Sequence, residues 1–226
     1  MEIYLVRHGT TEWNKLKKIQ GQSDIPLDST GLEMAHETGL ALKYAGISFD
    51  RIFSSPLVRA YRTAIELCAG REELINIIEK DDRLKELNFG NYEGHTLNEC
   101  TLLEGSTFEF FHSSPEKFFP CGSGESLGKL CIRAKDFMQN VAEPLYCSGA
   151  ERILITAHGA LNKAILMYVR GEKDIANFWG DGLQANCCIT IINVCQDSHK
   201  NFIYTIKENK TLYDPSLQKK AGNLLG

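Results

Sequence analysis

The stretch IYLVRHG, residues 3–9, decides the fold predicted for this chain, because an apolar run typical of a buried strand ends directly in Arg7 and His8. A second stretch of the same design, ILITAHG at residues 153–159, leads in the same way to His158. In an open parallel sheet, the loops at the carboxyl ends of the strands form the ligand crevice. The two imidazoles are therefore expected to reach one pocket despite their separation in sequence.

Length and composition favour one α/β domain over residues 1–226, since 43% hydrophobic residues are enough for a packed core. The net charge of −4 and the isoelectric point near 5.9 argue against nucleic acid or an anionic membrane as the main partner. Nothing in the sequence specifies an oligomeric state. No export signal or bilayer-spanning run is present, and the eight cysteines form no Cys-x-x-Cys pair, so we expect a cytoplasmic protein with reduced thiols.

Strand and helix patterns alternate along most of the chain, which is typical of βα units. We therefore predict a three-layer αβα sandwich with a mainly parallel central sheet, an antiparallel edge strand and a small helical lid. Strands are expected at residues 3–6, 51–54, 75–78 and 153–157, with a closing hairpin at 184–194 and 202–206. Two helix starts are also predicted: a capping box from Thr30 to Glu33, and an N-cap at Ser55 followed by Pro56.

Residues 95–124 are predicted to form the lid insertion, because the regular pattern weakens there while aromatic residues accumulate. Disordered linkers lack aromatic residues, so a short helical excursion over the open edge of the sheet fits the composition better. The phenylalanines of this segment are Phe108, Phe110, Phe111, Phe118 and Phe119. Their rings either form an apolar wall facing the crevice or pack together as the lid's own small core.

Three strand-to-helix junctions bring cationic and nucleophilic side chains to one edge of the predicted sheet. Arg7 and His8 follow one strand, Arg59 lies in the first turn of a later helix, and His158 follows another strand. Arginine binds phosphate oxygens through two parallel donors, and a neutral imidazole can attack phosphorus. One hydrogen bond to a charged group contributes only about 1.5–3 kcal/mol, so phosphomonoester hydrolysis needs several such groups. Each histidine alone is more simply explained as a packing residue, whereas their joint occurrence indicates phosphate chemistry.

Two other kinds of phosphate site do not fit the sequence. No cysteine is followed by an arginine six positions later, which excludes a cysteine-dependent phosphatase loop. Residues 124–130 are one residue short of a P-loop and lack its Ser or Thr, and Leu127 stands where a dinucleotide fingerprint needs glycine. No histidine spacing indicates a metal site, and no cofactor is expected.

The ordered motifs resemble those of the histidine phosphatase superfamily, in its phosphoglycerate mutase-like branch, from about Ile3 to Ile206. The matching segments are residues 5–9 (LVRHG), 13–14 (WN), 20–21 (QG), 24–27 (DIPL), 31 (G), 54–57 (SSPL), 59–60 (RA), 63–64 (TA), 84–90 (LKELNFG), 93–94 (EG), 124–126 (GES) and 157–159 (AHG). Such an ordered set is far more specific than any one of its members.

The resemblance implies a role for each candidate site residue. His8 is implied to be the nucleophile that becomes phosphorylated, and Glu86 the acid that protonates the leaving oxygen and then activates water. Arg7, Arg59 and His158 are implied to form the cationic phosphate pocket. The residues assigned to substrate binding are Asn14, Gln20, Gly21 and Gly159. The resemblance implies no metal.

Departures from the mutase pattern favour a phosphomonoester hydrolase acting on a small phosphorylated substrate. Related mutases carry an arginine and a tyrosine where this chain has Leu87 and Phe89. The lid contains Lys117 against four glutamates, so we predict that it repels a second acidic group and that its rings suit an uncharged leaving group. A cofactor-dependent phosphoglycerate mutase is one alternative. A noncatalytic anion-binding module is the other, but its mark would be loss of a site residue such as His8 or Glu86, and both are present.

Overall fold

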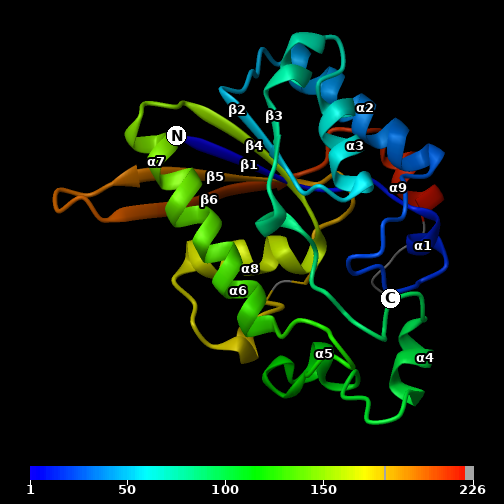
Figure 1. The fold of residues 1–226 in the computed structure, drawn as a ribbon. Helices are drawn as coiled ribbons and strands as arrows, with labels where there is room; N and C mark the ends of the chain where they lie inside the picture. The colour runs from blue at the N-terminus through cyan, green and yellow to red at the C-terminus, as the bar shows by residue number, and fades with distance from the viewer. Residues whose placement is uncertain (181, 222–226) are drawn as a thin grey trace.

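A six-stranded sheet forms the centre of the computed structural model, which describes residues 1–180 and 182–221 (Figure 1). The strand order is β3-β2-β4-β1-β5-β6, in which the first four strands are parallel and β5 runs antiparallel to both of its neighbours. The strands span Glu2–Arg7 (β1), Arg51–Ser54 (β2), Ile78–Lys80 (β3), Arg152–Ala157 (β4), Ile189–Gln196 (β5) and Phe202–Lys210 (β6). The predicted α/β class, mainly parallel with an antiparallel edge, is confirmed.

The register of β1 and β4 explains why two distant segments meet. The strands are parallel neighbours, with Val6 opposite Thr156 and Arg7 opposite Ala157. Both therefore end at the same height at the centre of the sheet, and the next residue of each is a histidine. His8 and His158 leave the sheet side by side as a direct consequence of this pairing.

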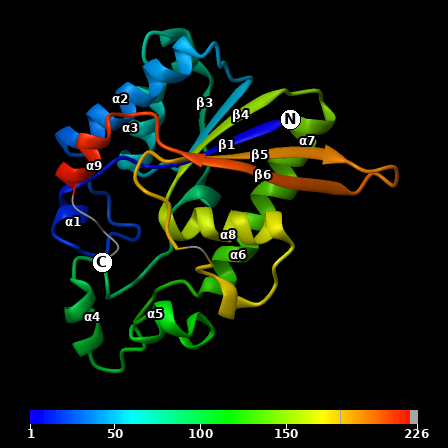
Figure 2. The same ribbon diagram turned by 180° about the vertical axis from the view of Figure 1, so that it is seen from behind.

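Helices cover both faces of the sheet and divide the core into two layers. Along β1 the side chains alternate, so that Ile3 and Leu5 join one hydrophobic cluster while Tyr4 and Val6 join the other. The first cluster includes residues of α6 and α8, and the second includes residues of α2 and α3, which Figure 2 shows on the opposite side of the sheet. These helices span Ser29–Tyr44 (α2), Val58–Leu67 (α3), Leu127–Phe137 (α6) and Gly159–Arg170 (α8).

The remaining elements are short and connect or cover this framework. They are α1 (Glu12–Lys15), α4 (Leu97–Leu102), α5 (Phe110–Ser113), α7 (Glu143–Cys147), α9 (Pro215–Ala221), the π-helical turn η4 (Met138–Ala142) and the 3-10 helices η1 (Glu72–Ile77), η2 (Asp82–Leu84), η3 (Pro115–Lys117) and η5 (Ile175–Asn177). Within the described ranges, none of the helices combines the length and apolar character needed to cross a membrane.

The segment predicted as a lid contains α4, α5 and η3, and most of its aromatic residues form a core of their own. Phe108, Phe111 and Phe118 are buried, and their ring centroids lie 4.7–6.1 Å apart. Phe119, by contrast, is 63% exposed. Of the two roles considered for these rings, self-packing accounts for Phe108 and Phe118, while Phe111 also lines the cleft described below.

Three local predictions were wrong, two about helix caps and one about the start of a strand. Asp28, not Thr30, caps α2 by accepting a 2.7 Å hydrogen bond from the amide of Gly31. The helix after β2 begins at Val58 with Leu57 as its N-cap residue, so Ser55 does not cap it. Residues 75–77 belong to a 3-10 helix, and the third strand starts only at Ile78.

Candidate active site

His8 lies at the end of β1 with its ring position set by backbone contacts. Its Nδ1 is 2.6 Å from the carbonyl oxygen of Gly9, and the side chain is only 3% exposed. The Nδ2 of Asn186 donates to the carbonyl of His8 at 2.9 Å. If Nδ1 carries the ring proton and donates to Gly9, the Nε2 lone pair is the free one.

His158 lies beside His8 but farther from solvent. The two ring centroids are 5.2 Å apart, and His158 is fully buried at the N-cap of α8. Its Nε2 is 2.8 Å from the Oγ of Ser55, while its Nδ1 has no hydrogen-bond partner among the described residues. The structure therefore brings the two predicted histidines together, with Ser55 holding the second one.

Both imidazoles are held in the neutral form. Burial is the main cause that lowers the pKa of His8 well below its usual value near 6.5, and the charges of Arg59 and Arg7 add to it. Burial and then the charge of Arg59 likewise lower the pKa of His158. A neutral imidazole at His8 is the form that can act as a nucleophile.

Two buried arginines supply positive charge beside the histidines. The Nη1 of Arg7 donates to the carbonyl of Gln184 at 2.6 Å, and the two Nη atoms of Arg59 donate to the carbonyls of Gly21 and Ser23 at 2.6 and 2.8 Å. In both side chains Nε has no partner in the described part of the chain. Burial lowers the pKa of Arg59 to about 10, so its guanidinium stays charged at neutral pH.

Glu93 orders the loop that holds Arg59. Its carboxylate accepts hydrogen bonds from the amides of Gln22 and Ser23 at 2.9 and 2.8 Å. Gly21, in the same loop, has a φ of 51°, and a Cβ at that position would collide with the Glu93 carboxylate. The conformation of this loop therefore requires glycine, and it aims two carbonyls at the guanidinium.

The carboxylate of Glu86 is hydrogen-bonded to the first turn of α8, the helix that has His158 at its N-cap. Its Oε2 accepts from the amide of Ala160 at 3.2 Å, and its Oε1 accepts from the amide of Leu161 at 3.1 Å. Arg133 of α6 donates to the Glu86 carbonyl at 2.9 Å and pairs with Glu125 at 2.7 Å. The carboxylate is thus held by backbone amides in the first turn of α8.

The predicted substrate-binding residues lie around the same cleft. The Oδ1 of Asn14 accepts from the amide of Thr11 in the capping box of α1, which leaves the amide Nδ2 for other contacts. Gln20 is buried, and its Oε1 has no partner among the described residues. Gly159 is so close to Arg7 and Glu86 that a Cβ there would lie 3.7 Å from each.

These groups line one cleft of about 180 Å³. The cleft is lined by Arg7, His8, Asn14, Lys17, Lys18, Ile19, Gln20, Gly21, Arg59, Glu86, Phe89, Leu97, Phe111, His112, Gly159, Ala160, Trp179 and Leu183. Eight of the nine predicted site residues are in this set; the ninth, His158, lies behind His8. The sequence analysis missed the two lysines, and it also missed the hydrogen-bonding role of Ser55, which it took for a helix cap.

The described residues form neither a metal site nor a serine nucleophile elbow. No group of three or more His, Cys, Asp or Glu side chains within residues 1–180 and 182–221 is arranged to hold a metal ion. The sequence was expected to contain no Gly-x-Ser-x-Gly elbow, but residues 124–128 match this pattern. The hydroxyl of Ser126 instead accepts from the amide of Lys129 as the N-cap of α6, and among the described residues no strand leads directly into this turn.

Comparison with known proteins identifies the family. Residues 3–203 match the model of the histidine phosphatase superfamily, branch 1. The chain belongs to the histidine phosphatase superfamily. The uncharacterized phosphatase PhoE of Bacillus subtilis is 37% identical to it over 175 residues, 75% of this chain and 77% of that protein. A 2,3-bisphosphoglycerate-dependent phosphoglycerate mutase of Parvibaculum lavamentivorans is 34% identical over 170 residues, 73% of this chain and 78% of that one.

A solved structure agrees with this assignment. Bacillus stearothermophilus YhfR superimposes with a TM-score of 0.78 at 28% identity, covering 91% of this chain and 96% of that one. This histidine phosphatase is an enzyme that hydrolyses phosphomonoesters, and a phosphohistidine intermediate is general to its family. The predicted family and enzyme class are confirmed, in preference to a noncatalytic binding module.

Proposed function

We propose that this histidine phosphatase hydrolyses small phosphorylated substrates with His8 as its nucleophile and Glu86 as its general acid and base. The observation that carries the proposal is the position of His8, whose buried ring lines the same cleft as the guanidinium groups of Arg7 and Arg59 and the carboxylate of Glu86. The unpartnered Nε atoms of Arg7 and Arg59 supply donors for phosphate oxygens. The unpartnered Nδ1 of His158 adds a third group behind the floor.

The proposed reaction has two steps. In the first, the Nε2 of His8 attacks phosphorus, the ester P–O bond breaks, and Glu86 in its protonated form gives its proton to the leaving oxygen. In the second, the Glu86 carboxylate takes a proton from water, the resulting hydroxide attacks phosphorus, and the P–N bond breaks to release inorganic phosphate. The two arginines neutralise the charge on the nonbridging oxygens in both steps.

We assign residues 95–124 to a lid insertion within a single domain that covers residues 1–226. Leu97 of α4 and both Phe111 and His112 of α5 line the cleft, which supports a role in covering it. Residues 222–226 of the proposed domain lie outside the described residues. We further propose a cytoplasmic location, because the eight cysteines are free, and free thiols persist in reducing compartments. Fractionation of cells that express the tagged full-length protein tests this location.

The decisive experiment measures hydrolysis of 4-nitrophenyl phosphate in the presence of a chelator, comparing the parent enzyme with His8→Ala. We expect the parent to be active and the variant to lose at least about 10³-fold in kcat, because the nucleophile is gone. His199→Ala is the matched control, since His199 is exposed in the β5–β6 turn and should leave kcat unchanged. Loss of the parent activity with the chelator, or retention of activity in His8→Ala, would overturn the proposal.

A phosphoglycerate mutase is the second candidate because one of the relatives reported above carries that name. The buried and apolar side chains of Leu87 and Phe89 speak against it, since neither can hold an acidic group. Phosphoglycerate supplied with 2,3-bisphosphoglycerate separates the two functions. Isomerisation at least as fast as hydrolysis would favour the mutase.

A further inference from the structure

The cleft has a second positive region at its mouth, the part that is lined by more exposed residues such as Lys17, Leu97 and His112. Its described lining residues include four cationic side chains and a single carboxylate, that of Glu86. Two of the cations, Arg7 and Arg59, lie on the floor beside His8. The other two, Lys17 and Lys18, follow α1 and are more exposed, so they are positioned to meet the leaving group of a bound phosphomonoester.

The backbone fixes both lysines at this mouth. Lys17 has a φ of 52°, a left-handed conformation that is uncommon for a residue with a side chain. Its amide donates to the carbonyl of Asn14 at 3.1 Å, and the amide of Lys18 donates to that of Trp13 at 2.9 Å. Lys18 also pairs with Thr96 in an isolated bridge, and its Nζ lies 5.9 Å from the centre of a ring of Trp13. The backbone of both lysines is therefore held beside the cleft that they line.

No carboxylate within residues 1–180 and 182–219 lies within 4.0 Å of either ammonium group. Glu99 is electrostatically near Lys18, but its carboxylate accepts from the amide and Oγ1 of Thr96 at 2.7 and 2.9 Å. The four lid glutamates are exposed and do not line the cleft: Glu99, Glu104, Glu109 and Glu116. The charge at the mouth is thus the opposite of what the lid sequence predicts.

Several other residues that line the cleft are apolar. The rings of Phe111 and Trp179 are in contact, with centroids 4.8 Å apart, and Leu183 lies on the same lining. The indole nitrogen of Trp179 donates to the carbonyl of Phe111, which holds the pair together. A leaving group in this cleft would therefore meet both an apolar surface and two ammonium groups.

We infer that the enzyme prefers phosphomonoesters whose leaving group is a ring or similar apolar body carrying a second anionic group, and that Lys17 and Lys18 determine this specificity. The inference rests on the proposed function and replaces the expectation of an uncharged leaving group. Lys17 and Lys18 act on the remote end of the substrate, so they change its affinity and orientation rather than the bonds that break.

The test compares two nearly isosteric substrates, 4-carboxyphenyl phosphate and 4-carbamoylphenyl phosphate, together with their 3-substituted isomers. The readout is the ratio of kcat/KM for the carboxylate over the amide at low salt, measured in the parent enzyme, Lys17→Gln, Lys18→Gln and the double variant. The intrinsic difference in reactivity between the two esters is the same for every variant. A change in this ratio therefore reports the contribution of the substituted lysine.

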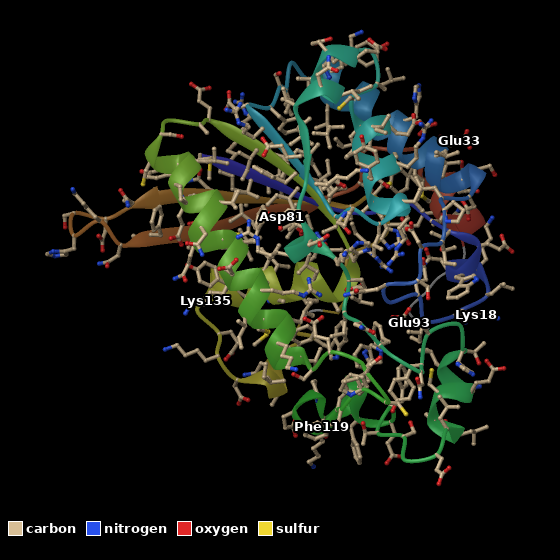
Figure 3. All side chains as sticks on the ribbon, viewed as in Figure 1. Lys18, Glu33, Asp81, Glu93, Phe119 and Lys135 are labelled. Carbon is tan, nitrogen blue, oxygen red and sulfur yellow. The ribbon has the colours of Figure 1, made fainter. Side chains whose placement is uncertain are left out.

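We expect the ratio to exceed one in the parent for at least one isomer pair. It should fall about threefold to fivefold in each single variant and further in the double variant, as is usual for a partly exposed ion pair. The ratio should also fall in the parent enzyme at high salt, whereas the Lys17→Arg/Lys18→Arg enzyme should keep the parent ratio at low salt. Lys135→Gln is the matched control, because Lys135 lies on α6, away from Lys18 and Glu93 (Figure 3).

A ratio of one or less in the parent at low salt for both isomer pairs, or a ratio unchanged in the double variant, would overturn the inference. Turnover of the carbamoyl ester by the parent enzyme tests the proposed function separately. If the parent hydrolyses neither ester, the proposed function fails; if it hydrolyses both without a lysine-dependent preference, only the inference fails.

Discussion

The floor and the mouth of the cleft are built in different ways. The floor consists of side chains at the ends of β1 and β4 and in the first turn of α3, together with Glu86 after η2, and its histidines and Arg59 are almost completely buried. The mouth comes from the loop after α1, the lid and the segment after η5, and several of its side chains are exposed. The difference indicates that the sheet positions the chemistry, whereas loops select the substrate.

This comparison leads to different expectations for substitutions. A change on the floor should lower turnover of every phosphomonoester, because all of them present the same phosphoryl group to the same catalytic residues. A change at the mouth should alter the ratio between substrates. The following predictions test that division, in order of decreasing effect.

The largest of these effects is expected for Glu86→Gln on the floor. Glutamine can still accept a hydrogen bond from the first turn of α8, but it cannot donate or remove a proton, so kcat should fall about 10²-fold to 10⁴-fold, with the larger loss for alkyl esters, whose more basic leaving oxygen depends more on protonation. Steady-state kinetics with both ester classes measures this loss. Glu116→Gln, on the exposed surface of the lid, is the control. A loss below tenfold would remove Glu86 from the proposed mechanism.

A smaller effect is expected in the pH dependence of the free energy of unfolding. The folded state lowers the pKa of His8 and His158 below the unfolded value of about 6.5, so below that pH the unfolded chain binds more protons. The free energy of unfolding should therefore be retained above pH 6.5 and should decline as the pH falls, by up to about 1.4 kcal/mol per pH unit for each histidine.

Urea denaturation between pH 7.5 and 5.5 measures this slope. His158→Asn should reduce it by the share of one histidine, whereas His199→Asn, at an exposed position, should not change it. An identical slope in the parent and in His158→Asn would mean that His158 is not held neutral in the folded enzyme.

The smallest effect is expected at the mouth, for Phe111→Leu. Loss of the ring that contacts Trp179 should reduce the preference for phenyl over cyclohexyl phosphate about twofold to tenfold, the range for one aromatic contact. Phe119→Leu is the matched control, because that ring is exposed and lies on the outer side of the lid region (Figure 3). Equal effects of the two substitutions would show that Phe111 acts through lid packing alone.

The sequence was most informative about the floor. Each floor histidine follows an apolar strand directly, and Arg59 lies in the first turn of a helix, so sheet topology alone brings them together. Glu86 was assigned by resemblance, since it lies on an irregular link where periodicity carries no information. Its tether through Arg133 depends on packing between segments far apart in the chain, which no local pattern reports.

The mouth was predicted poorly for a physical reason. Counting charges between residues 95 and 124 does not show which way a side chain points, and the lid glutamates face solvent. The position of Lys17 depends on a single left-handed residue after α1, a conformation that the sequence KLKK does not signal. Similarly, Asp28 and Thr30 are both good capping residues, and only the path of the loop decides between them.

The first turn of α8 has a consequence for how the enzyme tolerates motion. It carries His158 at its N-cap, and two of its amides bind the Glu86 carboxylate. The rest of this helix is buried along most of its length. Any movement of this turn would therefore shift Glu86 and His158 together, because two hydrogen bonds join the carboxylate to the helix whose N-cap is the imidazole.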